Sequence, residues 1–88
     1  MTRFRRHASA VSTELDNEVV ALQLDTKKYY TLNESAMVIW RGLAEPATED
    51  DLVDAITREF AIEPVAARPE VTALLQQFVD WRLAEPCD

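Results

Sequence analysis

The side chains that most often carry catalysis or bind metals are scarce in this sequence of 88 residues. It contains one histidine, His7, one cysteine, Cys87, and one glycine, Gly42. One histidine and one cysteine cannot supply the four ligands of a structural zinc site, and one cysteine cannot form an internal disulfide. A single glycine excludes the glycine-rich loops that bind nucleotide phosphates, and a catalytic triad would have to use His7 near the N-terminus. We therefore expect no enzyme activity, no metal site and no cofactor.

Four acidic residues, Glu49, Asp50, Asp51 and Asp54, form the one group that could suggest a hard-metal site. They follow Thr48 directly and stand at the beginning of a segment with helical spacing of its apolar residues. Acidic side chains are favoured in the first turn of a helix because they complement the positive end of its dipole. We therefore interpret the group as the start of a helix.

The chain has nine basic and sixteen acidic residues, which gives a net charge of −7. Residues 1–30 hold five basic and four acidic residues, whereas residues 31–88 hold four basic and twelve acidic ones. An acidic domain repels nucleic-acid phosphates, so we expect no nucleic-acid partner. The apolar runs are too short to cross a bilayer, and no apolar segment follows the basic start as it would in a secretory signal. A cytoplasmic location without a membrane partner is the expectation.

The first part of the chain has an apolar pattern with a period of two, which predicts β-strands. Residues 18–24 alternate so that Val20, Leu22 and Leu24 share one face, which we expect to be the buried face of a half-buried strand.

A second strand is predicted over residues 29–32, where Tyr30 and Leu32 share a face. It follows the first after a short turn at residues 25–28, so the two should be antiparallel neighbours. Residues 4–12 are a weaker candidate for the third strand of the sheet, and the sequence leaves open whether residues 1–12 form a strand or a mobile arm.

Beyond the strands the apolar period changes to about 3.6 residues, which predicts three helices. Asn33 and Thr48 are suitable N-caps for the first two, and Pro46 ends the first. Pro69 suits the first turn of the third helix, and Pro86 closes it. We predict a single α+β domain over residues 1–88, in which a three-stranded antiparallel sheet precedes three helices with the following inner residues: Ala36, Ile39, Trp40, Leu43; Leu52, Val53, Ile56, Phe60; Val71, Leu74, Leu75, Phe78.

The segment from residue 25 to residue 40 is the most specific part of the sequence. It resembles the PqqD-like family, the leader-peptide-binding domains also called RiPP recognition elements, where RiPP means a ribosomally made and post-translationally modified peptide. The family's aromatic strand, Leu-Asn pair and Ile-Trp on the first helix are matched here by Tyr30, Leu32, Asn33, Ala36, Ile39 and Trp40. Later matches are Asp51, Leu52, Val53, Phe60, Leu74, Leu75, Phe78 and Leu83, so the resemblance covers residues 18–84. Arg82 stands where the family often has glycine, and the residues after Ile39 resemble the standalone proteins of lasso-peptide biosynthesis.

The resemblance implies a winged helix-turn-helix-like fold that binds the leader region of a precursor peptide as an added β-strand. It also implies that this protein presents the precursor to a separate leader peptidase of the cysteine-protease type and to a macrocyclase. The peptide-binding residues implied by it lie on the second predicted strand and the third helix: Lys28, Tyr29, Tyr30, Thr31, Leu32, Val71, Leu74, Leu75 and Phe78.

The residues themselves support this edge as a binding site. From Tyr29 to Leu32 there is no proline, glycine or charge of the kind that normally protects an exposed strand edge. Lys27 and Lys28 precede this stretch, where they discourage self-association and attract an acidic peptide.

A winged-helix DNA-binding or regulatory domain is the alternative, because its fold is similar. The expected recognition helix over residues 70–84 has one basic residue, Arg82, against Glu70 and Asp80. DNA-binding helices usually carry several basic residues, so the charge pattern favours the peptide-binding hypothesis.

Overall fold

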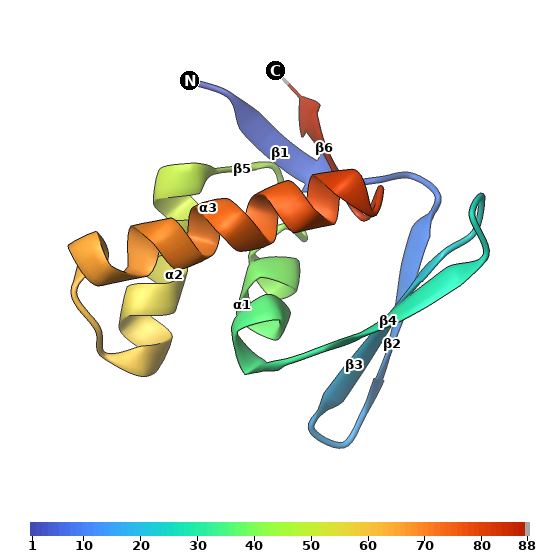
Figure 1. Ribbon diagram of the computed structural model, residues 1–88, viewed down its shortest axis with the longest axis horizontal. Coiled ribbons are helices and arrows are strands. Elements are labelled where there is room, and N and C mark those ends of the chain that lie inside the picture. Colours follow the sequence, from blue (N-terminus) through green and yellow to red (C-terminus); the bar gives the residue numbers. More distant parts are fainter. Residues whose placement is uncertain (88) are drawn as a thin grey trace.

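The computed structural model describes residues 1–87, which form two small sheets and three helices (Figure 1). The larger sheet has the order β2–β3–β4 and consists of β2 (Ala10–Leu15), β3 (Glu18–Gln23) and β4 (Lys28–Leu32). The smaller has the order β5–β1–β6, with β1 (Arg3–Arg6), β5 (Ala47–Thr48) and β6 (Ala84–Cys87). The helices are α1 (Glu34–Gly42), α2 (Glu49–Phe60) and α3 (Pro64–Asp80). The predicted α+β class, with a three-stranded antiparallel sheet followed by three helices, is confirmed.

The N-terminal segment forms two strands in different sheets, so the third strand of the larger sheet is Ala10–Leu15 and not the weaker candidate over residues 4–12. Strand β1 pairs with β5 and β6, whereas β2 pairs with β3. Between them, the His7 Nδ1 accepts a hydrogen bond from Ser9 N–H at 3.0 Å, and Ala10 N–H donates to the His7 carbonyl at 3.0 Å. The second sheet was missed because β5 and β6 are too short to show an alternating pattern and lie far from β1 in sequence.

Strand β3 buries the face opposite to the predicted one. Val19 and Ala21 have no exposed surface, while Leu24 is 48% exposed. Both faces of this segment are apolar, so the alternation alone does not identify the inner one, and a shift of one residue exchanges the faces. The small Ala21 fits inside because it lies opposite Tyr30, whose ring packs against the core. The predicted inner residues lie on the outer face instead: Val20, Leu22 and Leu24.

The first two helices begin at the predicted caps. The Asn33 side chain accepts a hydrogen bond from Ala36 N–H at 2.9 Å at the start of α1. At the start of α2, the Thr48 hydroxyl accepts from Asp51 N–H at 3.1 Å, and the Asp51 carboxylate accepts from Thr48 N–H at 2.9 Å. These hydrogen bonds to Thr48 lower the pKa of Asp51 because they favour its ionised form.

The acidic residues at the start of α2 interact with α3. The Arg68 guanidinium forms ion pairs with Glu49 at 2.7 Å and with Asp50, which raises the pKa of Arg68. The Thr72 hydroxyl also donates to Glu49 at 2.9 Å. These carboxylates therefore stabilise the contact between α2 and α3, in agreement with their interpretation as a helix start.

Helix α3 is longer at its start and shorter at its end than the sequence predicted. It begins at Pro64, where the missing N–H is tolerated in the first turn, and Ala67 in that turn has no exposed surface. Pro69, predicted near the start, lies inside the helix. The helix ends at Asp80, and Pro86, predicted to close it, is part of β6. No helix of residues 1–87 is long and apolar enough to cross a membrane.

Trp40 connects α1 with both sheets and with α3. Its indole N–H donates to the Ser12 hydroxyl on β2 at 3.0 Å, and its ring meets the edge of Phe78 at 6.3 Å between centroids. The Arg6 guanidinium of β1 lies 4.2 Å from the Trp40 ring centroid and donates to the Trp40 carbonyl at 2.7 Å. Burial at this position lowers the pKa of Arg6. The helices and the two sheets therefore share one core.

The end of α3 is a Schellman turn with arginine in the left-handed position. Arg82 has a φ of 59° and donates its N–H to the Val79 carbonyl at 3.0 Å. Leu83 N–H donates to the Phe78 carbonyl at 2.8 Å. Glycine is the usual residue at this position because other residues are strained there.

Replacing Arg82 with glycine should raise the free energy of unfolding by about 1 kcal/mol, because an L-residue in the left-handed conformation costs about 1–2 kcal/mol and glycine removes this strain. Part of the gain is lost because glycine makes the unfolded chain more flexible. Urea denaturation followed by circular dichroism measures the change. Arg58→Gly, inside α2, is the matched control and should lower stability by about 1 kcal/mol. An equal loss of unfolding free energy in Arg82→Gly and Arg58→Gly would show that Arg82 is not strained.

Candidate peptide-binding site

Strand β4 has an open backbone edge. It pairs with β3 on one side, and no strand formed by residues 1–87 pairs with the other side. Leu24 N–H, just after β3, donates to the Ser9 carbonyl at 2.8 Å and so points away from β4. Backbone groups alternate in direction along an antiparallel ladder, so Tyr30 bonds with β3 while the N–H and C=O groups of Tyr29 and Thr31 point outward. These two residues can pair with an added strand.

The end of α3 lies beside this edge. The rings of Tyr30 and Trp81 are stacked, with centroids 4.3 Å apart and planes inclined by 14°. Leu74 is half-buried and lies seven residues before Trp81, which places it on the same side of the helix. We call this combination of Lys28–Leu32 with Leu74 and Trp81 the β4–α3 surface. It offers backbone hydrogen bonds on the strand and apolar contacts on the helix.

The structure brings the two predicted groups of site residues together but buries part of them. Three of the predicted residues are exposed: Lys28, Tyr29 and Thr31. Two are half-buried: Tyr30 and Leu74. The other four belong to the core, with at most 4% exposure: Leu32, Val71, Leu75 and Phe78. These four residues present almost no area to a ligand in this conformation. Their contribution to the site is the packing on which the exposed residues rest.

Trp81 was not among the predicted site residues. It lies three residues after Phe78, the last inner residue predicted for the third helix. Its spacing of seven residues from Leu74 was the available signal, but its partner Tyr30 could be identified only from the packing of β4 against α3.

A buried amide fixes the position of the α3 end relative to the turn before β4. Gln23 has no exposed surface and is the one buried polar residue within residues 1–87. Its Nε2 donates to the Arg82 carbonyl at 3.0 Å, and its Oε1 accepts from Asp25 N–H at 2.6 Å and Thr26 N–H at 3.3 Å. One side chain thus links the turn and the helix end at one end of the β4–α3 surface.

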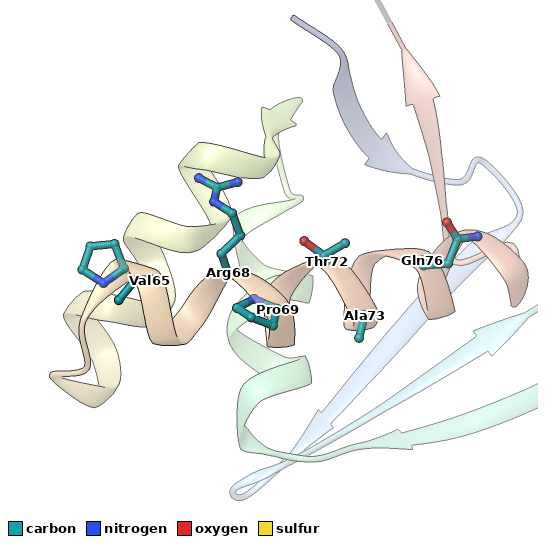
Figure 2. A pocket seen from close by; sticks show the side chains of 7 residues that line it. Val65, Arg68, Pro69, Thr72, Ala73 and Gln76 are labelled. Atoms are coloured by element: carbon teal, nitrogen blue, oxygen red, sulfur yellow. The ribbon is translucent and has the colours of Figure 1, made fainter.

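A hollow of about 820 Å³ lies along α3 and shares no lining residue with the β4–α3 surface (Figure 2). Apolar contacts there come from Val65, Pro69 and Ala73, and Val65 is 83% exposed. All the residues that line it belong to α3, so no second element encloses a ligand. We therefore do not assign it as the binding site.

The fold and the open strand edge beside a helix define a small α+β domain of the winged-helix type. Comparison with protein families matches residues 18–84 to coenzyme PQQ synthesis protein D (PqqD). Because this match covers most of the chain, the protein belongs to the PqqD family, as the sequence resemblance predicted. No curated protein sequence matches the chain.

Two solved structures are similar over nearly the whole chain. One, described as TbiB1 in complex with the TbiA(beta) leader peptide, has a TM-score of 0.84 and 28% sequence identity, covering 92% of this chain and 94% of that one. The other, lasso peptide synthetase B1 complexed with the leader peptide, has a TM-score of 0.80 and 24% identity, covering 94% and 98%. The predicted resemblance to leader-peptide-binding proteins is confirmed, since both similar structures contain a leader peptide, and the fold is shared with a lasso peptide synthetase B1.

Replacing Gln23 with leucine should lower the free energy of unfolding by about 2 kcal/mol, because losing the partner of a buried polar group costs about 1–3 kcal/mol. Chemical denaturation monitored by circular dichroism gives this value. Gln77→Leu, at an exposed position of α3, is the control and should change stability by less than about 0.5 kcal/mol. A Gln23→Leu variant as stable as wild type would refute the role of the amide in linking the two elements.

Proposed function

We propose that this protein binds the leader region of a ribosomally made precursor peptide and presents it to a separate leader peptidase and a macrocyclase in lasso-peptide biosynthesis. The observation that carries this proposal is the open edge of β4, where Tyr29 and Thr31 direct their backbone groups outward next to α3. Strand addition uses such an edge for affinity and adjacent side-chain contacts for selection. The similar structures that contain leader peptides support the same role.

The domain itself would act without catalysis. His7 uses its Nδ1 to accept a hydrogen bond from Ser9 N–H and lies 3.8 Å from Glu85, in the turn between the two sheets. Cys87 is paired through β6 with Arg3 of β1, on the smaller sheet. Neither residue belongs to the β4–α3 surface. A bound leader would instead raise the local concentration of the precursor near its enzymes, to roughly the millimolar range for a short flexible tether.

The outer face of the β2–β3–β4 sheet is a suitable docking surface for the peptidase. It exposes several large apolar side chains, and patches of this kind usually mark protein interfaces: Val11, Leu15, Leu24 and Tyr29. This face continues directly from the free edge of β4, so a leader bound at that edge would emerge beside a peptidase bound to the face.

The alternative DNA-binding role has less support from the charges on α3. Arg68 is engaged by Glu49 and Asp50, while Glu70 and Asp80 add acidic groups to the same helix. DNA-binding helices usually carry several basic residues that contact phosphates.

Replacing Thr31 with proline should weaken leader binding while leaving the fold intact. Proline removes an outward N–H that the sheet does not use, and proline is tolerated on edge strands. We expect an affinity loss of at least tenfold, about 1.4 kcal/mol. Fluorescence anisotropy would use the leader of a precursor encoded beside this protein, with the TbiA(beta) leader as a second probe. Thr31→Val keeps the N–H and should bind like wild type.

Unchanged binding by folded Thr31→Pro would rule out strand addition at β4. If neither leader bound wild type at 100 µM, while random duplex DNA bound in a salt-dependent manner, the regulatory alternative would replace the proposal. Circular dichroism of each variant shows whether it is folded.

Replacing Val11 with aspartate should separate leader capture from presentation. Val11 is 45% exposed on the outer face of β2 and away from the open edge of β4. We expect leader affinity to remain within twofold of wild type and cleavage by the cognate peptidase to fall at least fivefold, since a charge would replace apolar contact area. Leader binding and precursor cleavage would be measured on the same preparation. Equal cleavage rates would exclude this face as the docking surface.

A further inference from the structure

Three basic residues that form no ion pair lie at one end of the β4–α3 surface. Three arginines elsewhere in residues 1–87 form ion pairs with carboxylates: Arg5 with Glu85, Arg41 with Glu14, and Arg68 with Glu49 and Asp50. Lys27, Lys28 and Arg82 form no ion pair of this kind. All three are exposed to solvent. In a chain with a net charge of −7, this end of the surface is a distinct feature.

Gln23 holds the three basic residues in one neighbourhood. Lys28 is its partner across the ladder, so the two side chains are on the same, helix-facing side of the sheet. Lys27 N–H donates to the Gln23 carbonyl at 2.8 Å, and the Gln23 amide donates to the Arg82 carbonyl at 3.0 Å. The residues come from the turn, the strand and the helix end, and each contacts the same buried residue.

Two acidic residues, Asp25 and Asp80, are close in sequence to this cluster. Asp25 lies in the turn and Asp80 in the last turn of α3, and neither forms an ion pair with the cluster. The Asp80 carboxylate instead accepts a hydrogen bond from Gln76 at 3.0 Å. A carboxylate from a ligand could therefore approach Lys28 and Arg82 without displacing an existing ion pair.

We propose that the leader peptide carries an acidic residue at the end of its added strand that lies beside Lys28, and that its carboxylate binds between Lys28 and Arg82. This inference rests on the proposed function and adds the charge and register of the ligand. Strand β4 begins at Lys28, so a peptide paired along the whole edge must pass this cluster. Apolar side chains would contact Tyr30 and Leu74, while the carboxylate would form charge-assisted hydrogen bonds at the end. The electrostatic contact then selects among peptides and fixes their register.

The test selects peptides directly on the protein. A display library of random 12-residue peptides is enriched on immobilised wild type, on Lys28→Glu/Arg82→Glu and on Arg58→Glu. We expect wild type to select Asp or Glu on one side of the apolar segment and the double variant to select Lys or Arg there. The control Arg58→Glu reverses one basic residue on α2, the same change of charge as Lys28→Glu alone, and should keep the wild-type preference.

A quantitative arm uses one peptide selected by wild type and its variant with the acidic residue replaced by the corresponding amide. The replacement should weaken binding to wild type about tenfold at low salt and have no effect on binding to Lys28→Glu/Arg82→Glu. Lys28→Glu alone replaces the double variant if circular dichroism shows that the change at Arg82 disturbs the helix end.

The results separate the inference from the proposed function. Strand addition is supported if the selected peptides bind wild type but not Thr31→Pro. The inference is overturned, and strand addition left intact, if these peptides show no preference for an acidic residue. The same conclusion holds if Lys28→Glu/Arg82→Glu still selects acidic peptides. Enrichment of no peptide that depends on Thr31 would overturn strand addition and the inference together.

Discussion

The buried amide of Gln23 determines how the strand edge and the third helix lie relative to each other. It contacts the turn before β4 through Asp25 and Thr26 and the helix end through Arg82. A buried carbonyl or amide without a partner is costly, so this arrangement resists small displacements of either element. The Tyr30–Trp81 stack and the basic cluster both depend on the spacing that the amide maintains.

The second constraint is the junction at Trp40, which explains why the edge of β4 stays open. Arg6 and Ser12 bind Trp40 from different sheets, so the N-terminal segment is divided between them. The first strand of the chain pairs with β5 and β6 in the smaller sheet and is not available to extend the larger sheet beyond β4. Lys27 and Lys28 at the start of this edge oppose pairing between copies of the same protein.

The features that the sequence predicted well are those encoded by local chemistry. The caps at Asn33 and Thr48 depend on hydrogen bonds within three residues, and both appear as predicted. Which face of β3 is buried depends on what packs against it. Because both faces carry apolar residues, the sequence pattern did not distinguish the buried face from the exposed one. Contacts between distant segments, such as Tyr30 with Trp81, have no local signature. The helical half of the candidate site was therefore recognised as a group, but its exposed members were not separated from its buried ones.

Strand addition suits a domain of this size because it requires no cavity. A chain of this length buries only about 60–65% of its unfolded surface, and removing core volume to form a pocket would cost stability. Backbone groups at a strand edge can bind a peptide without that cost, but their hydrogen bonds do not distinguish one peptide side chain from another. Selectivity must therefore come from the few groups that border the strand. In the proposed site these groups would be the apolar Tyr30–Trp81 pair and the basic residues around Lys28, and the amide of Gln23 links the strand and the helix end that carry them.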